Sequence, residues 1–231
     1  MEIRRLSLIP GAKNATGLAV IIDVFRAFTT AAYAFSNGAT KIIPVGSVEE
    51  ALELRKLHPD WFLMGEEDGI KVEAFDHGNS PSEIKEVPLV GRTIVQRTSA
   101  GTQGIVNAVN ASEILPGSFV IADATVDYIR ARNPETVSLV AMGWGGMEIA
   151  PEDELLAEYI QIRLDGGKPD FQEMKRKIRE HSQGAKFFDP SQPQFVEGDF
   201  HAAMDLNRFN FVLRVVGDRR PYIESITKPY V

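Results

Sequence analysis

Short apolar runs rich in β-branched residues alternate with helix-like stretches through the first two thirds of the chain. Two of these runs, LAVII and VSLVAM, are almost wholly apolar, which is typical of strands covered on both faces. We predict strands at Glu2–Ile9, Leu18–Asp23, Lys41–Val45, Trp61–Met64, Thr93–Gln96, Ser118–Ile121 and Val137–Met142. We predict helices between them at Phe25–Ser36, Val48–Leu57, Thr102–Val109, Thr125–Arg132 and Glu152–Leu164. The alternation predicts an α/β fold with a mostly parallel sheet flanked by helices.

The pattern changes after Asp165, where the segment GGKP interrupts the alternation. A basic amphipathic helix is predicted at Phe171–His181, and a loop-rich stretch follows it. Two more strands are predicted at Phe211–Val216 and Tyr222–Ile226. We therefore predict an α/β core over residues 1–165 and a C-terminal α+β segment over residues 166–231. This segment packs on the core, either as a subdomain or as part of one continuous domain.

Composition excludes several classes of function. The 231 residues carry 25 Lys and Arg against 32 Asp and Glu, and the formal charge of −7 argues against a nucleic-acid or anionic-membrane partner. The chain has no cysteine, which excludes disulfides, thiolate metal sites and a cysteine nucleophile. No apolar run reaches the roughly 18–20 residues that cross a bilayer, so we expect a cytoplasmic protein. A homodimer is left open.

Acidic residues follow several predicted strands, and ligands of open α/β sheets bind at such carboxyl ends. Asp23 ends the LAVII run and is either a helix cap or a metal ligand or catalytic acid. Glu66 lies in GEEDG, which either forms an acidic turn or supplies oxygen ligands to Mg²⁺. Glu152 and Asp153 open a helix after the glycines of GWGG, where the helix dipole alone favours acids.

Two further clusters carry hydroxyl, amide and imidazole groups. FDHGNSP contains Asp76, His77, Asn79 and Ser80, and Ser80 forms a capping box with Glu83. RTSAGT is either an ordinary strand-to-helix turn or an anion cradle, and its polar and glycine positions are Arg97, Thr98, Ser99, Gly101 and Thr102. Oxygen ligands beside phosphate cradles predict Mg²⁺-assisted chemistry on a small anionic phosphate ester.

The blocks DVFRAFTT, GEEDG with FDHGNSP, and RTSAGT resemble the 2-phosphosulfolactate phosphatase (ComB) family in content and order. AMGWGGMEIAPEDELLAEYI and FHAAMDLNRFNFVLRVV resemble later parts of that family, so the resemblance spans nearly the whole chain. It implies an unusual α/β fold and a Mg²⁺-dependent reaction in which 2-phosphosulfolactate is hydrolysed to 3-sulfolactate and phosphate. In methanogens this step belongs to coenzyme M biosynthesis.

The resemblance points to individual residues, the polar clusters add Arg97, Ser99 and His77, and we assign roles to them as a hypothesis. The expected metal ligands are Asp23, Glu66, Asp76 and Glu152. The expected phosphate-binding residues are Arg26, Asn79, Ser80, Arg97, Thr98, Ser99, Gly101 and Thr102. Arg26 is expected to act in catalysis as well, Asp76 or Asp153 to orient the attacking water, and His77 to protonate the leaving alkoxide.

Two positions depart from the family pattern. Glu67 stands where the family has arginine, which adds a like charge beside a doubly anionic substrate. Ala100 stands where the family has asparagine, which removes an amide donor, and Arg97 is the residue that could compensate in part. The departures favour either a less anionic substrate or reduced activity. The alternative functions are therefore a phosphatase of another small phosphorylated hydroxy acid and a non-catalytic protein that binds such a metabolite.

Overall fold

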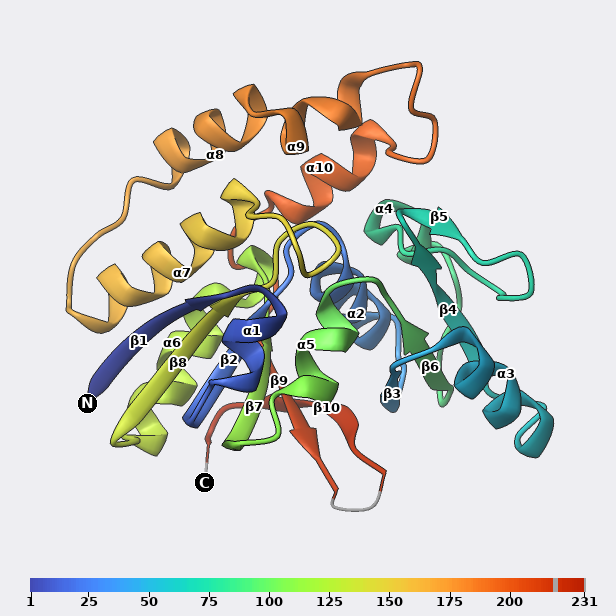
Figure 1. Cartoon of the computed structure of the whole chain (residues 1–231), viewed down its shortest axis with the longest axis horizontal. Helices are drawn as coiled ribbons and strands as arrows, with labels where there is room; N and C mark the ends of the chain where they lie inside the picture. The colour runs from blue at the N-terminus through green and yellow to red at the C-terminus, as the bar shows by residue number, and fades with distance from the viewer. Residues whose placement is uncertain (218–219, 231) are drawn as a thin grey trace.

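The computed structural model describes residues 1–217 and 220–230 (Figure 1). Its strands are β1 (Glu2–Ser7), β2 (Gly17–Ile22), β3 (Lys41–Val45), β4 (Phe62–Glu67), β5 (Ile70–Lys71), β6 (Thr93–Arg97), β7 (Ala111–Gly117), β8 (Thr136–Ala141), β9 (Phe211–Val216) and β10 (Tyr222–Thr227). Its α-helices are α1 (Leu8–Lys13), α2 (Ala27–Ser36), α3 (Val48–Leu57), α4 (Pro81–Ile84), α5 (Gly101–Asn107), α6 (Ala122–Arg132), α7 (Pro151–Leu164), α8 (Phe171–Glu180), α9 (Ser182–Ala185) and α10 (Glu197–Ala203). Two 3₁₀ helices are η1 (Phe119–Ile121) and η2 (Lys186–Phe188).

The strands form a sheet in the order β1-β8-β2-β7-β9-β10-β3-β6-β4-β5. A first parallel block contains β1, β8, β2 and β7, and a second contains β3, β6 and β4. The antiparallel hairpin β9–β10 lies between the two blocks, and β5 adds an antiparallel edge. The predicted α/β fold with a mostly parallel sheet is confirmed.

Helices cover both faces of the sheet, which explains why its strands are apolar without alternation. In β2, Ala19 and Ile21 belong to a hydrophobic cluster that they share with α2 and α5. The intervening residues Leu18, Val20 and Ile22 face the other way, into a cluster with α6 and α7. A third cluster joins α3 to the second parallel block. The strand ends that carry the polar motifs are thereby held between well-packed layers.

One predicted strand is wrong. Ser118–Ile121 does not form a strand, because Phe119–Ile121 forms η1 and leads into α6. The strand of this region is β7, which lies just upstream and pairs in parallel with β2. Its last residues, Pro116 and Gly117, are break signals in the sequence and yet take part in that pairing.

The C-terminal segment contributes to both the surface and the centre of the molecule. In Figure 1, α8, α9 and α10 (orange) form an outer arc beyond α7, whereas β9 and β10 lie within the sheet. Among the described residues, no helix is long and apolar enough to span a bilayer.

Candidate active site

A pocket of ≈ 390 Å³, counted with the open space at its mouth, lies where the chain leaves β2, β4, β6 and β8. Its lining includes Asp23, Arg26, Glu66, Asn79 and Ser99, all of which are predicted site residues. Trp144 and Phe195 give it an aromatic wall. The structure therefore brings together five motifs that lie apart in the sequence, since Trp144 belongs to GWGG.

Asp23 follows β2 and contacts the start of α2. Its Oδ1 accepts the N–H of Ala27, the first residue of α2, at 3.0 Å, although the N-cap position itself is Arg26. Burial, together with the negative charge of Glu66, raises the pKa of Asp23 to about 6 against the effect of that N–H. Asp23 therefore binds the start of α2 and is a carboxylate that would be stabilised by a cation in the pocket.

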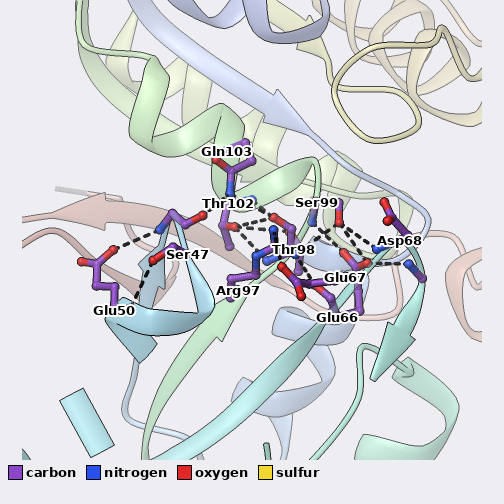
Figure 2. A network of polar contacts seen from close by, with 12 residues as sticks. Ser47, Glu50, Glu66, Glu67, Asp68, Arg97, Thr98, Ser99, Thr102 and Gln103 are labelled. Atoms are coloured by element: carbon purple, nitrogen blue, oxygen red, sulfur yellow. Dashed lines mark hydrogen bonds and ion pairs between the residues drawn. The ribbon is translucent and has the colours of Figure 1, made fainter. Parts of the chain in front are cut away.

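Glu66 joins the β4–β5 turn to the loop after β6 (Figure 2). Its Oε1 accepts the N–H of Ser99 at 2.7 Å, and its Oε2 accepts the N–H of Gly69 at 2.6 Å and the hydroxyl of Ser99 at 3.2 Å. Both carboxylate oxygens are thus already hydrogen-bonded within the protein. This arrangement favours a positioning role for Glu66 over a direct metal bond.

The RTSAGT loop is held by its own hydroxyls. The N–H of Thr98 donates to Thr102 Oγ1 at 2.9 Å, and the N–H of Thr102 donates to Thr98 Oγ1 at 3.1 Å. Gly101 begins α5 in close contact with α2, since a Cβ there would lie 2.8 Å from Asp23 Oδ2 and 2.7 Å from the Cβ of Ala27. Thr98, Gly101 and Thr102 therefore shape the loop, and Ser99 and Ala100 line the pocket.

Glu67 forms an ion pair with Arg97, with 3.2 Å between Nη2 and Oε1 (Figure 2). Arg97 also donates from Nη1 to the main-chain oxygen of Glu66 at 2.6 Å. The negative charge of Glu67, which departs from the family pattern, thus offsets the positive charge of Arg97. Neither charge is free to act alone on a ligand.

Arg26 is buried beside the pocket and is held by Asp199 of α10. Its Nη1 donates to Asp199 Oδ2 at 2.8 Å and to the main-chain oxygen of Gln194 at 2.9 Å, and its Nη2 donates to that of Gly69 at 2.9 Å. A guanidinium has five N–H groups, so two remain for a ligand. The second oxygen of Asp199, Oδ1, accepts the hydroxyls of Ser80 and Ser82 at 2.6 Å each.

Asn79 and Ser80 have different environments although they are adjacent. Ser80 caps α4 by accepting the N–H of Glu83 at 3.3 Å, as the capping box predicts. Asn79 is buried, lines the pocket, and its Oδ1 accepts no hydrogen bond from the described residues. A buried oxygen without a donor is costly, which points to a bound partner for Asn79.

Glu152 and Asp153 lie buried in the first turn of α7. Asp153 accepts the N–H of Val24 and the N–H of Gly143 at 2.8 Å each, and so joins the loops after β2 and β8. Glu152 Oε2 accepts no hydrogen bond from the described residues. Burial raises the pKa of Glu152 to about 7, and the charge of Asp23 adds to the rise. Burial and the charge of Glu152 also raise the pKa of Asp153.

Asp76 and His77 lie outside the pocket. Asp76 is exposed, forms an ion pair with Arg55 of α3 and accepts the N–H of Leu63 at 2.8 Å. His77 Nδ1 lies 3.0 Å from the main-chain oxygen of Gly78. The FDHGNSP segment lies against β4, where the backbone of His77 pairs with that of Met64. The structure does not bring them to the other predicted ligands.

A magnesium ion would need oxygens that the protein leaves free. The described residues contain no group of three or more Asp, Glu, His or Cys side chains arranged to hold a metal ion. Mg²⁺ usually takes only one or two carboxylates and completes its shell with waters and phosphate oxygens. Asp23, Glu152 and the amide oxygen of Asn79 fit that smaller requirement, because they are buried oxygen donors and two have unpartnered atoms.

Two charged residues of the site have no motif in the sequence. Asp199 is fully buried and holds Arg26, and Lys186 of η2 is buried against the aromatic wall of the pocket. Both come from the loop-rich C-terminal stretch, where no periodic pattern marks them. The acids of EGDF and the lysine of AKFF are indistinguishable in sequence from solvated surface charges.

Comparisons with known proteins agree on one family. A family model described as 2-phosphosulpholactate phosphatase matches residues 4–215. A Bacillus subtilis protein named "Probable 2-phosphosulfolactate phosphatase" is 32% identical over 211 residues, which cover 90% of this chain and 91% of the relative. Proteins of the same name from Thermotoga petrophila and Thermoplasma acidophilum are 37% and 33% identical, over 73% and 70% of this chain and 77% and 71% of their own length.

Proposed function

The chain belongs to the 2-phosphosulfolactate phosphatase family, and we propose that it hydrolyses 2-phosphosulfolactate to 3-sulfolactate and phosphate in a Mg²⁺-dependent reaction. The observation that carries the proposal is the pair of buried carboxylates, Asp23 and Glu152. Burial raises the pKa of both, and the charge of Asp23 raises that of Glu152 further. The positive charge of Lys186 offsets Glu152 in part, and a divalent ion would stabilise both carboxylates further.

Asp23 and Glu152 would hold the ion, with the amide oxygen of Asn79 as a third donor. When bound, Mg²⁺ would neutralise charge on the phosphoryl oxygens. Glu66 and Asp153 would fix the positions of the surrounding loops, because their oxygens already accept main-chain N–H groups of those loops. Asp76 and His77 are left out of this site because their side chains contact Arg55, the N–H of Leu63 and the main chain of Gly78 instead.

Arg26 would bind the transferred phosphoryl group through its two remaining N–H groups. Phosphoryl transfer has a loose transition state and needs positioning and charge stabilisation more than a strong base. The hydroxyl of Ser99 lines the pocket and donates to Glu66 Oε2 at 3.2 Å, so it would contact a second phosphoryl oxygen only by exchanging that hydrogen bond. The residues of the site therefore act mainly by holding the phosphate in line with an attacking water.

A phosphatase acting on a less anionic hydroxy acid is the second candidate. The pocket lining carries Asp23, Glu66 and Asp68 against Arg26 alone, and Arg26 is paired with Asp199. Glu67 also offsets Arg97 nearby. This acidic balance favours a substrate with fewer negative charges unless a cation shields it.

The test is phosphate release from three substrates, 2-phosphosulfolactate, 2-phospholactate and 2-phosphoglycerate, each with MgCl₂ and with EDTA. We expect release with MgCl₂, its loss in EDTA, and the highest kcat/KM for 2-phosphosulfolactate. Asp23→Asn should lower kcat/KM by about 10²–10³. Preference for another member of the panel would favour the second candidate. Release from none of them, with calorimetric binding retained, would indicate a metabolite-binding protein instead.

A further inference from the structure

Lys186 is a buried cation at the wall of the pocket. Its side chain is 9% exposed, and its ammonium lies 3.9 Å from the ring centroid of Trp144 and 4.4 Å from that of Phe195. Both rings line the pocket. Lysine is rarely buried this far unless its charge is used, so its environment requires an explanation.

The charge of Lys186 is met by the faces of Trp144 and Phe195 and, from beyond ion-pair distance, by the buried acid Glu152, but it has no directly bonded carboxylate among the described residues. Its Nζ donates one hydrogen bond, to Gln183 Oε1 at 2.6 Å. Among the described residues, none places a carboxylate within ion-pair distance of Nζ, whereas the other buried cation, Arg26, is bonded to Asp199 at 2.8 Å. An ammonium has three N–H groups, so two of those of Lys186 are left for a ligand.

Lys186 and Arg26 flank the same aromatic ring. The Arg26 Cζ lies 5.1 Å from the Phe195 centroid, and the Lys186 Nζ lies 4.4 Å from it. A molecule that carries two anionic groups a few bonds apart can therefore meet one cation with each group. An anion on a short carbon chain next to a phosphate ester has this form.

We propose that Lys186 is a specificity-determining residue, which binds the anionic group of the substrate that is not transferred. This inference rests on the proposed phosphatase function and assigns the two anionic groups of the substrate to two different cations. Arg26 takes the phosphoryl group, and Lys186 takes the sulfonate or the carboxylate. The aromatic rings around Nζ exclude water, and the lower local dielectric strengthens the attraction of the ammonium for an anion.

The test compares substrates that differ only in the second anion. These are 2-phosphosulfolactate, 2-phospholactate (carboxylate only), phosphorylated 2-hydroxyethanesulfonate (sulfonate only) and isopropyl phosphate (neither). With 2-phosphosulfolactate as the substrate, we expect Lys186→Met to raise KM about 10- to 100-fold, the range of a lost charge-assisted hydrogen bond, with a smaller change in kcat. Its preference for 2-phosphosulfolactate over isopropyl phosphate should fall by a similar factor.

The single-anion substrates identify the group. A loss confined to the two sulfonates assigns the sulfonate to Lys186, and a loss confined to the two carboxylates assigns the carboxylate. Lys186→Arg should restore most of the preference, because it restores the charge. Lys168→Met, which changes an exposed lysine between α7 and α8, should leave it unchanged.

Equal losses on all four substrates would overturn the inference and assign Lys186 a structural role. Failure of the wild-type protein to release phosphate from any of them would instead contradict the proposed function, so the two failures are distinguishable. If Lys186→Met does not fold, Lys186→Gln, which keeps a polar group, provides the same comparison.

Discussion

Asp199 is the residue whose contacts most directly determine the orientation of Arg26. It is fully buried, and it bonds Arg26 through one oxygen and two serine hydroxyls through the other. We expect Asp199→Asn to lower kcat/KM by about 10²–10³, because the guanidinium loses its fixed position. Breaking the buried pair should also lower the free energy of unfolding by about 3 kcal/mol.

Steady-state kinetics and urea unfolding measure both effects of Asp199→Asn. Asp205→Asn is the control, since Asp205 is exposed and lies six residues further along the chain. Unchanged kcat/KM in Asp199→Asn would show that Arg26 does not need this partner for activity.

The buried carboxylates of Asp23 and Glu152 make the stability of the metal-free protein depend on pH. The folded protein raises the pKa of Asp23 from 3.8 to about 6 and that of Glu152 from 4.5 to about 7. The folded state therefore binds these protons more tightly than the unfolded state, and stability falls as the pH rises from about 4 to about 7. Each carboxylate should account for about 1–3 kcal/mol of that loss.

Urea unfolding in EDTA at about pH 5 and about pH 8 measures this dependence. Glu152→Gln should flatten it and be more stable than the wild type at the higher pH, although it is less active. MgCl₂ should stabilise the wild type at the higher pH and stabilise Glu152→Gln less. A wild-type protein equally stable at both pH values in EDTA would contradict the raised pKa values of these buried acids.

The sequence identifies individual site residues only where they belong to a motif. Asp23, Glu66, Asn79 and Ser99 end or follow apolar strands, and strand ends of this fold converge. Asp199 reaches Arg26 across more than 170 positions of chain, and no local pattern can report such a contact. Asp76 is assigned to the predicted site from its motif alone. Its side chain instead forms an ion pair with Arg55 of α3.

The packing of α5 against α2 requires glycine at position 101, because there is no room for a side chain. A Cβ at this position would lie 2.8 Å from Asp23 Oδ2 and 2.7 Å from the Cβ of Ala27. We expect Gly101→Ala to push α5 away from Asp23, to lower kcat/KM at least tenfold and to destabilise the fold by about 1–3 kcal/mol.

Gly46→Ala is the matched control, because no atom lies within 4 Å of a Cβ at Gly46. It precedes α3 and should change neither activity nor stability by a comparable amount. Equal effects of the two substitutions in kinetics and urea unfolding would show that close packing at Gly101 is not the cause.

Local signals predict elements well only where no tertiary contact overrides them. Ser47 caps α3 by accepting the N–H of Glu50 at 3.1 Å, and Asn133 ends α6 with a left-handed φ of 45°. β7 is different, because Pro116 should end a strand. In the described residues β7 meets β9 at Ile114 and Val215, so Pro116 lies beyond that contact and only β2 pairs along its length.

We expect the hairpin β9–β10 to make the whole molecule unfold as one cooperative unit. Each of its strands pairs with one parallel block, so neither block has a complete sheet without it. We expect a single unfolding transition, reported alike by Trp61 near the second block and Trp144 near the first. Leu213→Ala should shift that transition by about 2–4 kcal/mol, because Leu213 is fully buried in β9.

Urea unfolding followed by fluorescence and circular dichroism tests this, with single-tryptophan variants separating Trp61 from Trp144. Val90→Ala, at a residue that is 83% exposed, is the control. Two separate transitions, with residues 166–231 unfolding first, would instead favour an independent C-terminal subdomain. The alternation of strands and helices predicts the fold class but not this insertion, since pairing between distant strands leaves no trace in local periodicity.

The position of this hairpin has a consequence for how the protein is made. On the ribosome, β9 and β10 emerge after every other described strand, and Lys186 and Asp199 emerge shortly before them. Until then the nascent chain presents β7 and β3 as open edges, which are prone to pair with other chains. The sheet is therefore completed only after β10 has been synthesised, and we expect a chain that stalls before residue 211 to be inactive and to bind chaperones.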